Sequence, residues 1–237
     1  MYSSVILAGL GSYTQSVIEA LEYIANHWGV FLTLLQTHMT IVLVGVGAAI
    51  VVAVPLGIVV TRHDKLGWMV MNMGAIAQTL PPLAVIAISF SFLGLGRNPV
   101  ILALFFYALL PILKNTVAGL RSVDDSKVEA GRGMGMTQFE RLTRIELPLA
   151  MPVIFAGIRT STVMSVGVAY LGAFIGAGGF GNWVVLGQQQ LDTHITMAGA
   201  IPGAALVIVL DQLFKRLQGV VTPATSTTKE NTEISAA

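Results

Sequence analysis

Long uncharged stretches, separated by short polar ones, dominate the sequence. A helix that crosses the hydrocarbon core of a membrane needs about 20 mainly apolar residues, because the core is about 30 Å thick and each residue rises about 1.5 Å. Five stretches meet this requirement and are predicted to span a membrane: 39–61, 66–92, 98–120, 152–175 and 195–214. The pattern therefore predicts an all-α membrane protein with about five core spanning helices.

The distribution of Lys and Arg predicts how these helices are oriented, because short cytoplasmic loops carry an excess of basic residues. Residues 1–38 contain no Lys or Arg. The loop after the first predicted span, the middle segment 121–148 and the residues after the last span are basic, whereas the two remaining loops hold only Arg97. The N-terminus is therefore expected outside and the C-terminus in the cytoplasm.

The two ends of the chain differ from its middle. Apolar residues recur near helical spacing within 12–38, which predicts an amphipathic helix on the outer surface, continuous with the first span or bent into it. A sixth span there is the less favoured alternative, because it would break the charge asymmetry. No basic residue precedes the first apolar run, so no secretory signal peptide is predicted. The polar, Thr- and Ser-rich end predicts a disordered cytoplasmic tail over 218–237, which leaves 1–38 as an outer segment and 39–217 as the transmembrane domain.

Composition supports a membrane protein and excludes several other classes. The chain is 54% hydrophobic and only 11% charged, whereas soluble domains carry about 25% charged residues. A formal net charge of +1 gives no general attraction to nucleic acid. The chain has no cysteine, and its 4 histidines are scattered over separate segments, so neither a disulfide nor a metal site is predicted.

One segment in the middle of the chain is unusually charged. Of 13 basic and 12 acidic residues in the whole chain, ten lie within 121–146. Both 126–129 and 137–140 match the S/T-x-x-E capping box, in which two side chains satisfy free amides at a helix start. Gly133 and Gly135 lie between them, and glycine readily takes the left-handed conformation that ends a helix. Two short helices joined by a glycine elbow are therefore predicted.

The second of these short helices has an apolar stripe. Phe139, Leu142 and Ile145 recur at a spacing of three residues, framed by side chains of both charges, and Pro148 is expected to end the helix. A basic amphipathic helix often lies on lipid headgroups, but a lipid-binding face would favour Lys and Arg alone. The mixed charge instead suits docking into a groove of another protein.

The same segment resembles a family signature. Glu129-Ala130-Gly131, then Gly135, then Ile145-x-Leu147-Pro148 follow the pattern E-A-A-x3-G-x9-I-x-L-P of binding-protein-dependent ABC importer permeases, and depart from it only at Gly131. The resemblance extends over about 39–214. Within it, YALLPILKNTVAGL, the segment 133–161 and LGAFIGAGGFG look most like permeases for osmoprotectants such as glycine betaine, choline or carnitine. Methionine-type permeases share the loop and are the alternative.

The resemblance implies a type I importer fold in a multi-pass protein of the cell inner membrane. It also implies a second permease, identical or related, together with cytoplasmic ATPase subunits and an external or periplasmic substrate-binding protein. The chain would then be a non-catalytic subunit without a cofactor of its own, and ATP would be bound by the partner; no phosphate-binding loop motif occurs in it. The residues implied to couple ATP hydrolysis to transport are Glu129, Ala130, Gly131, Gly135, Phe139, Leu142, Ile145, Leu147 and Pro148.

Polar residues within the spans are candidates for lining the passage, because polar groups that face lipid are costly. Taken singly, each is more often bonded to its own helix or to a neighbouring one. The cluster 78–82 is favoured, because tandem prolines leave free carbonyls that need protein or water beside them. The candidates are Asn72, Gln78, Thr79, Pro81, Pro82, Tyr107, Thr160, Ser161, Thr162 and Ser165.

Three further features bear on these predictions. The run 176–181 matches G-x-G-x-x-G, but it follows a predicted span rather than a strand, so a flexible outer turn is predicted instead of a dinucleotide site. Asp211 and Lys215 are spaced to pair at the inner edge of the last span, and Arg159 is expected to reach the interface or pair.

Two other functions are alternatives to an importer permease. A multi-spanning enzyme is a distant alternative, because the spans hold few titratable groups. An autonomous channel or carrier is the other.

Overall fold

The structure is a computed structural model that describes residues 2–221, with the side chains of residues 14–219. Within residues 2–221 the chain is helical and contains no strand, which confirms the predicted all-α class. The helices are α1 (Tyr2–Asn26), α2 (Trp28–Thr61), α3 (Asp64–Thr79), α4 (Pro82–Leu93), α5 (Arg97–Arg121), α6 (Asp125–Gly133), α7 (Gln138–Arg141), the π-helical turn η1 (Leu142–Glu146), α8 (Leu147–Ala169), the 3-10 turn η2 (Tyr170–Ile175), α9 (Gly181–Gln190) and α10 (Thr193–Val221).

Four stretches of the described residues are long and apolar enough to cross a membrane: Trp28–Thr61, Arg97–Arg121, Gln138–Ile175 and Thr193–Gly219. The pair α3 and α4 supplies a fifth span if the two are counted together, although they are bent by 96° at their break. Counted with this bent pair, the described residues contain the five spans that were predicted. The predicted tail 218–237 lies mostly outside the described residues.

The helix that contains the first predicted span, 39–61, begins at Trp28, so residues 28–38 are continuous with that span. Thr37 and His38, which lie just before the predicted start of the span, are both buried inside the protein. The preceding helix α1 ends at Asn26, and the chain bends at His27. Its residues Ala20 and Ile24 are buried, because α1 packs against α10.

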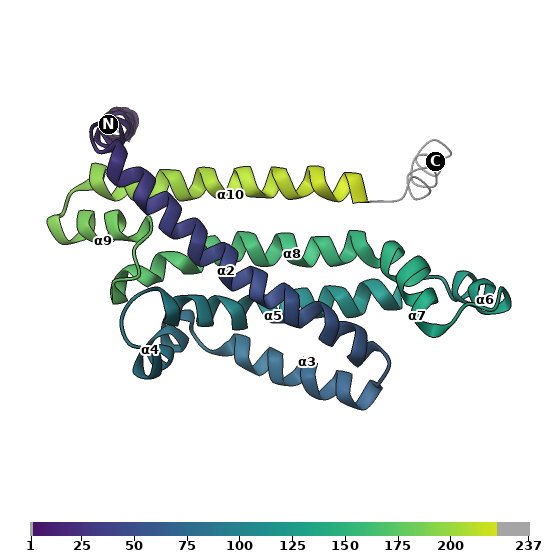
Figure 1. The fold of residues 1–237 in the computed structure, drawn as a ribbon. Coiled ribbons are helices and arrows are strands. Elements are labelled where there is room, and N and C mark those ends of the chain that lie inside the picture. Colours follow the sequence, from purple (N-terminus) through teal and green to yellow (C-terminus); the bar gives the residue numbers. More distant parts are fainter. Residues whose placement is uncertain (1, 222–237) are drawn as a thin grey trace, which may run out of the picture.

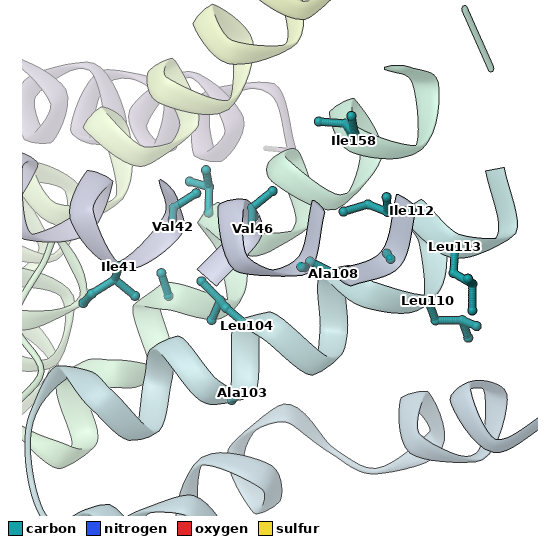
Figure 2. Packing of buried hydrophobic residues seen from close by; sticks show 14 of the residues in the cluster. Ile41, Val42, Val46, Ala103, Leu104, Ala108, Leu110, Ile112, Leu113 and Ile158 are labelled. Atoms are coloured by element: carbon teal, nitrogen blue, oxygen red, sulfur yellow. The ribbon is translucent and has the colours of Figure 1, made fainter. Parts of the chain in front are cut away.

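The core of the protein is formed where α2, α5 and α8 pack together. Figure 2 shows Ile41, Val42 and Val46 of α2 beside Leu104 and Ala108 of α5. A second cluster joins α1, α9 and α10 around the buried rings of Phe180 and Trp183. Two apolar clusters thus hold the long helices side by side.

Glycines allow the core helices to approach closely. A Cβ atom on Gly45 of α2 would lie 2.8 Å from the Cβ of Leu104 and 3.2 Å from the carbonyl oxygen of Ile101. On α8, a Cβ atom on Gly157 would lie 2.6 Å from the Cβ of Asn115. Any larger side chain at these positions would force α2 or α8 away from α5.

The helices α6 and α7 extend beyond one end of the bundle, while α4 and α9 lie at the other (Figure 1). The ends of α2 and α10 and the start of α3 also lie at the α6–α7 end. These segments carry most of the basic residues, including Arg62, Lys65 and Lys215. The fold therefore gathers segments that are distant in the sequence at one charged end.

The close contact at Gly45 can be tested by substitution. We expect Gly45→Val to destabilise the protein by about 1–3 kcal/mol, because an overpacked core must move its backbone or adopt strained rotamers. Gly47→Val is the matched control, since no atom lies within 4 Å of a Cβ atom placed there. Thermal unfolding in detergent checks both, and equal unfolding temperatures for the two variants would contradict the packing described.

Candidate coupling surface and passage

The first short helix of the charged segment, α6, begins earlier than the sequence indicated. Its N-cap is Asp124, whose carboxylate accepts a hydrogen bond of 2.9 Å from the backbone N–H of Ser126. The predicted capping box of Ser126 and Glu129 is therefore wrong. Because an aspartate two residues upstream already caps the helix, Ser126 lies inside the first turn and Glu129 is left exposed.

The start of the second short helix and the glycine elbow are as predicted. Thr137 caps α7: its hydroxyl accepts from the backbone N–H of Glu140 at 3.3 Å, and the Glu140 carboxylate accepts from the N–H of Thr137 at 2.9 Å. Between α6 and α7, Gly135 has φ +78°, a left-handed conformation that other residues adopt only with strain. The elbow therefore depends on glycine at this position.

Pro148 does not end the second helix, in contrast to the prediction. The chain continues from α7 through the π-helical turn η1 into α8, and Gln138–Ile175 is one helical span. The N–H of Leu147 donates to the carbonyl of Leu142, five residues earlier. Pro148 lacks an N–H for the normal helical bond to Arg144, and the wider turn just before it lets the helix continue.

The predicted apolar stripe of Phe139, Leu142 and Ile145 is partly exposed and partly buried. Phe139 is 73% exposed, as is Met134 at the elbow at 69%. Leu142 is partly buried against the core, and Ile145 is also partly buried. Only Phe139 of the predicted stripe is therefore available to a partner. We refer to the exposed residues Glu129, Ala130, Met134 and Phe139 as the coupling surface, after the role that the sequence predicts for this segment.

Gly131, the one departure from the family pattern, is buried where α6 meets the π turn. A Cβ atom at this position would lie 2.6 Å from the Cδ1 of Ile145. The terminal methyl group of Ile145 thus occupies the space that an alanine side chain would need. Because that methyl group can rotate away, glycine here permits close packing of α6 on η1 rather than a different backbone.

The remaining residues that were predicted to couple ATP hydrolysis to transport lie closer to the membrane-spanning part of the helix. Leu147 is partly buried and packs against the core, whereas Pro148 is exposed. A groove of about 710 Å³ separates α7 from the end of α2, with Phe139 and Leu142 on one side and Val59 and Arg62 on the other. The segment therefore projects from α8 with open space between itself and α2.

The break between α3 and α4 is held by α5. The Nε2 of Gln78 donates to the carbonyl of Tyr107 at 3.2 Å, and the hydroxyl of Tyr107 donates to the carbonyl of Leu80. Pro81 caps α4 and Pro82 is its first residue, so the two prolines stand where a helix start tolerates them. The predicted cluster thus forms a fixed bend beside the apolar groove of about 480 Å³ that Tyr107 helps to line.

A family model supplies the decisive comparison. Residues 49–227 match the model of the binding-protein-dependent transport system inner membrane component. The chain belongs to this family. It is a permease, a multi-pass membrane subunit of a transport system.

Relatives of this permease cover most of its length. The choline transport system permease protein OpuBB of Bacillus subtilis is 42% identical over 203 residues, which make up 86% of this chain and 94% of that protein. The carnitine transport permease protein OpuCD of Listeria monocytogenes is 43% identical and covers 83% of this chain and 88% of its own. The osmoprotectant import permease protein OsmW of Salmonella typhimurium is 40% identical, with 87% and 98% covered.

The fold also matches a solved structure. An inward-facing structure of the MetNI methionine ABC transporter aligns with a TM-score of 0.74 at 20% identity, over 82% of this chain and 97% of that one. At this identity the likeness concerns the fold alone. The permease therefore has the type I ABC importer fold that the sequence predicted.

The polar candidates for the passage occupy different environments in the permease. Ser161, Thr162 and Ser165 are buried, and the hydroxyl of Ser161 donates across to the carbonyl of Ala108 on α5 at 3.1 Å. Asn72, Thr79 and Thr160 are exposed, although Asn72 and Thr79 also donate to carbonyls of their own helix. Ser161 therefore joins α8 to α5, whereas the hydroxyl of Thr162 donates to the carbonyl of Ile158 on its own helix at 2.8 Å. The exposed residues are the ones that are accessible to a passage.

The glycine-rich turn after α8 is a packed element of the permease. Gly176, Gly178 and Gly179 have φ between +71° and +86°. A Cβ atom on Gly179 would lie 2.9 Å from the Nδ1 of His38, which is fully buried and has its Nε2 3.1 Å from the carbonyl of Val166. The turn therefore lies against α2. This role of His38 was not predicted, although a polar residue beside a long apolar run was a signal.

A three-residue ionic cluster joins α8 to α10. The predicted pair of Asp211 and Lys215 forms at 2.9 Å, and Asp211 also accepts a 2.5 Å hydrogen bond from the Nε of Arg159. The expectation that Arg159 could pair is met by a partner on another helix. Among the described residues, no group of three or more His, Cys, Asp or Glu side chains is arranged to hold a metal ion.

The capping assignments predict different effects for two similar substitutions. We expect Thr137→Ala to weaken α7 by about 1 kcal/mol, because the substitution removes an N-cap. Ser126→Ala should have little effect, since Asp124 caps α6. Hydrogen exchange of the amides of residues 138–141 and 125–133 measures the local stability of each helix. Faster exchange in α6 of the Ser126→Ala variant would contradict the assignment.

Proposed function

We propose that this permease imports a quaternary-amine osmoprotectant, such as glycine betaine, choline or carnitine, and that a separate ATPase subunit drives it. The substrate class is supported by relatives of 40–43% identity that are named for choline, carnitine and osmoprotectant transport. These relatives align over more than four fifths of the chain. The requirement for a binding protein follows from the family to which the chain belongs.

The observation that carries the mechanism is the exposed coupling surface at the start of a continuous helix. Glu129 on α6 and Phe139 on α7 are exposed, and the helix that begins with α7 continues through η1 as α8 into the core. A partner that holds the coupling surface therefore holds the start of a core helix. Movement of two ATPase subunits toward each other would move α8 and alternate the access of the passage between the two sides.

The orientation proposed for the permease places the α6–α7 end in the cytoplasm. Segments with most of the basic residues meet at that end, as the charge rule for cytoplasmic loops requires. The substrate-binding protein would then act at the opposite end, near α4 and α9. A second permease, identical or related, completes the passage. We propose that the bend at residues 78–82 and the exposed Asn72 and Thr160 line it.

The substrate is tested in proteoliposomes that contain the permease complex purified with its ATPase and binding protein. Glycine betaine, choline, carnitine and methionine are each supplied with ATP inside. We expect at least one of the quaternary amines to accelerate ATP hydrolysis and to be taken up, and methionine to do neither. Stimulation by methionine alone would identify an amino-acid importer. Uptake by the permease alone would indicate an autonomous carrier.

The same assay tests the coupling surface. Glu129→Lys reverses an exposed charge in the proposed ATPase contact, and like charges across an interface lower affinity strongly, so uptake should fall by about tenfold or more while the protein remains in the membrane. Lys65→Glu, an equally large charge change at the exposed start of α3, is the control and should stay within about twofold of wild type. Wild-type uptake by the Glu129→Lys complex would exclude this contact.

A further inference from the structure

A single ion pair bridges the space between the end of α2 and the π turn. The guanidinium of Arg62, the residue that follows α2, contacts the carboxylate of Glu146 in η1. The side chain of Glu146 is only 7% exposed, whereas that of Arg62 is 36% exposed. A buried carboxylate is strongly destabilising unless it is paired, so Glu146 depends on Arg62.

The position of this pair is unusual because the surrounding space is open. The groove between α7 and α2 is lined by Arg62 and His63 on the α2 side and by Gln138 and Phe139 on the α7 side. Arg62 also stands at the C-terminal end of α2, where a positive charge is favoured by the helix dipole. The pair therefore connects the base of the coupling segment to α2 across a gap.

Glu146, the ion-pair partner of Arg62, lies in a part of the helix that can bend. A π-helical turn forms wider rings than an α-helix and is a common site of bending. η1 lies between the coupling surface and the membrane-spanning part of α8. If this turn bent freely, movement of the coupling surface would be absorbed there and would not reach the core.

We propose that the Arg62–Glu146 ion pair prevents such bending, and that it transmits movement of the coupling segment to α2 as well as to α8. This proposal rests on the proposed function, since it requires an ATPase that moves the coupling surface. α2 is a central helix of the apolar core and packs against both α5 and α8. Separating the pair would leave a buried charge uncompensated, so Glu146 and the end of α2 move together. Arg62 and Glu146 are thus positioning residues for transport.

A second ion pair at the same end of the protein serves as a matched comparison. Arg121 contacts Asp64 at 2.9 Å, joining the ends of α5 and α3. Its side chains are 54% and 94% exposed, respectively, and exposed pairs contribute little because water and salt screen them. Breaking this pair by Asp64→Asn changes charge at the same end but leaves no buried charge.

The test measures uptake per ATP hydrolysed in the complete complex in proteoliposomes. Arg62→Gln and Glu146→Gln should lower this ratio by about fivefold or more, in the range by which residues between two sites change their coupling. The charge swap Arg62→Glu with Glu146→Arg should recover about half of the wild-type ratio, since contacting residues are not additive. Asp64→Asn should leave the ratio unchanged.

A neutral double variant separates coupling from folding. Arg62→Met with Glu146→Gln leaves no unpaired charge, so the protein should accumulate in the membrane, yet its ratio should be as low as that of the single variants. A wild-type ratio in this variant would overturn the proposal. So would the failure of both double variants to accumulate, because the pair would then be needed only for folding. Lack of uptake by the wild-type complex would instead count against the proposed function itself.

Discussion

The link between the coupling segment and the core depends on a helix that continues through Pro148. A proline inside a helix removes one hydrogen bond and crowds the preceding turn, and the usual result is a break or a kink. Here the turn from Leu142 to Glu146 is widened to a π-helix, and the helix continues from Gln138 to Ile175. Because the helix is not interrupted, Phe139 of the coupling surface and the core helix α8 belong to one element, and α6, which carries Glu129, packs against its π turn η1. The proposed transmission of force begins with this property of the backbone.

Other features of the charged segment support the same element. The widened turn places Glu146 toward α2, where Arg62 neutralises it, and places Ile145 against the backbone of Gly131. Thr137 and Glu140 fix the start of the helix, and Gly135 turns the chain between α6 and α7. At the other end of the protein, the glycine-rich turn packs against His38 and holds α2 beside the end of α8. Local caps and a few long-range contacts thus connect a mostly polar segment to the core helices.

The sequence predicted the parts of this structure that depend on local chemistry. Hydropathy located the spans, the capping box located Thr137 at a helix start, and the spacing of Glu129, Gly135 and Pro148 indicated the family. Features that depend on packing were missed or wrong. The role of His38 was missed because periodicity does not show that a polar side chain is buried between helices. The cap of α6 was assigned to Ser126 instead of Asp124 because two adjacent residues can both act as caps. The helix was predicted to end at Pro148 because a π turn has no clear sequence pattern. The partner of Glu146 lies 84 positions away, beyond any local pattern.

The most direct test of the account is whether the coupling segment and α8 move as one body. The chain has no cysteine, so Thr143→Cys and Met164→Cys place two spin labels on exposed positions of the same continuous helix. Their separation is measured by pulsed electron paramagnetic resonance in the assembled complex, without nucleotide and with ATP bound to a hydrolysis-deficient ATPase. The account predicts the same distance distribution in both states, in a complex that is shown to take up substrate when its ATPase is active. A shifted or split distribution on ATP binding would show that the helix bends at the π turn, and would contradict the central claim.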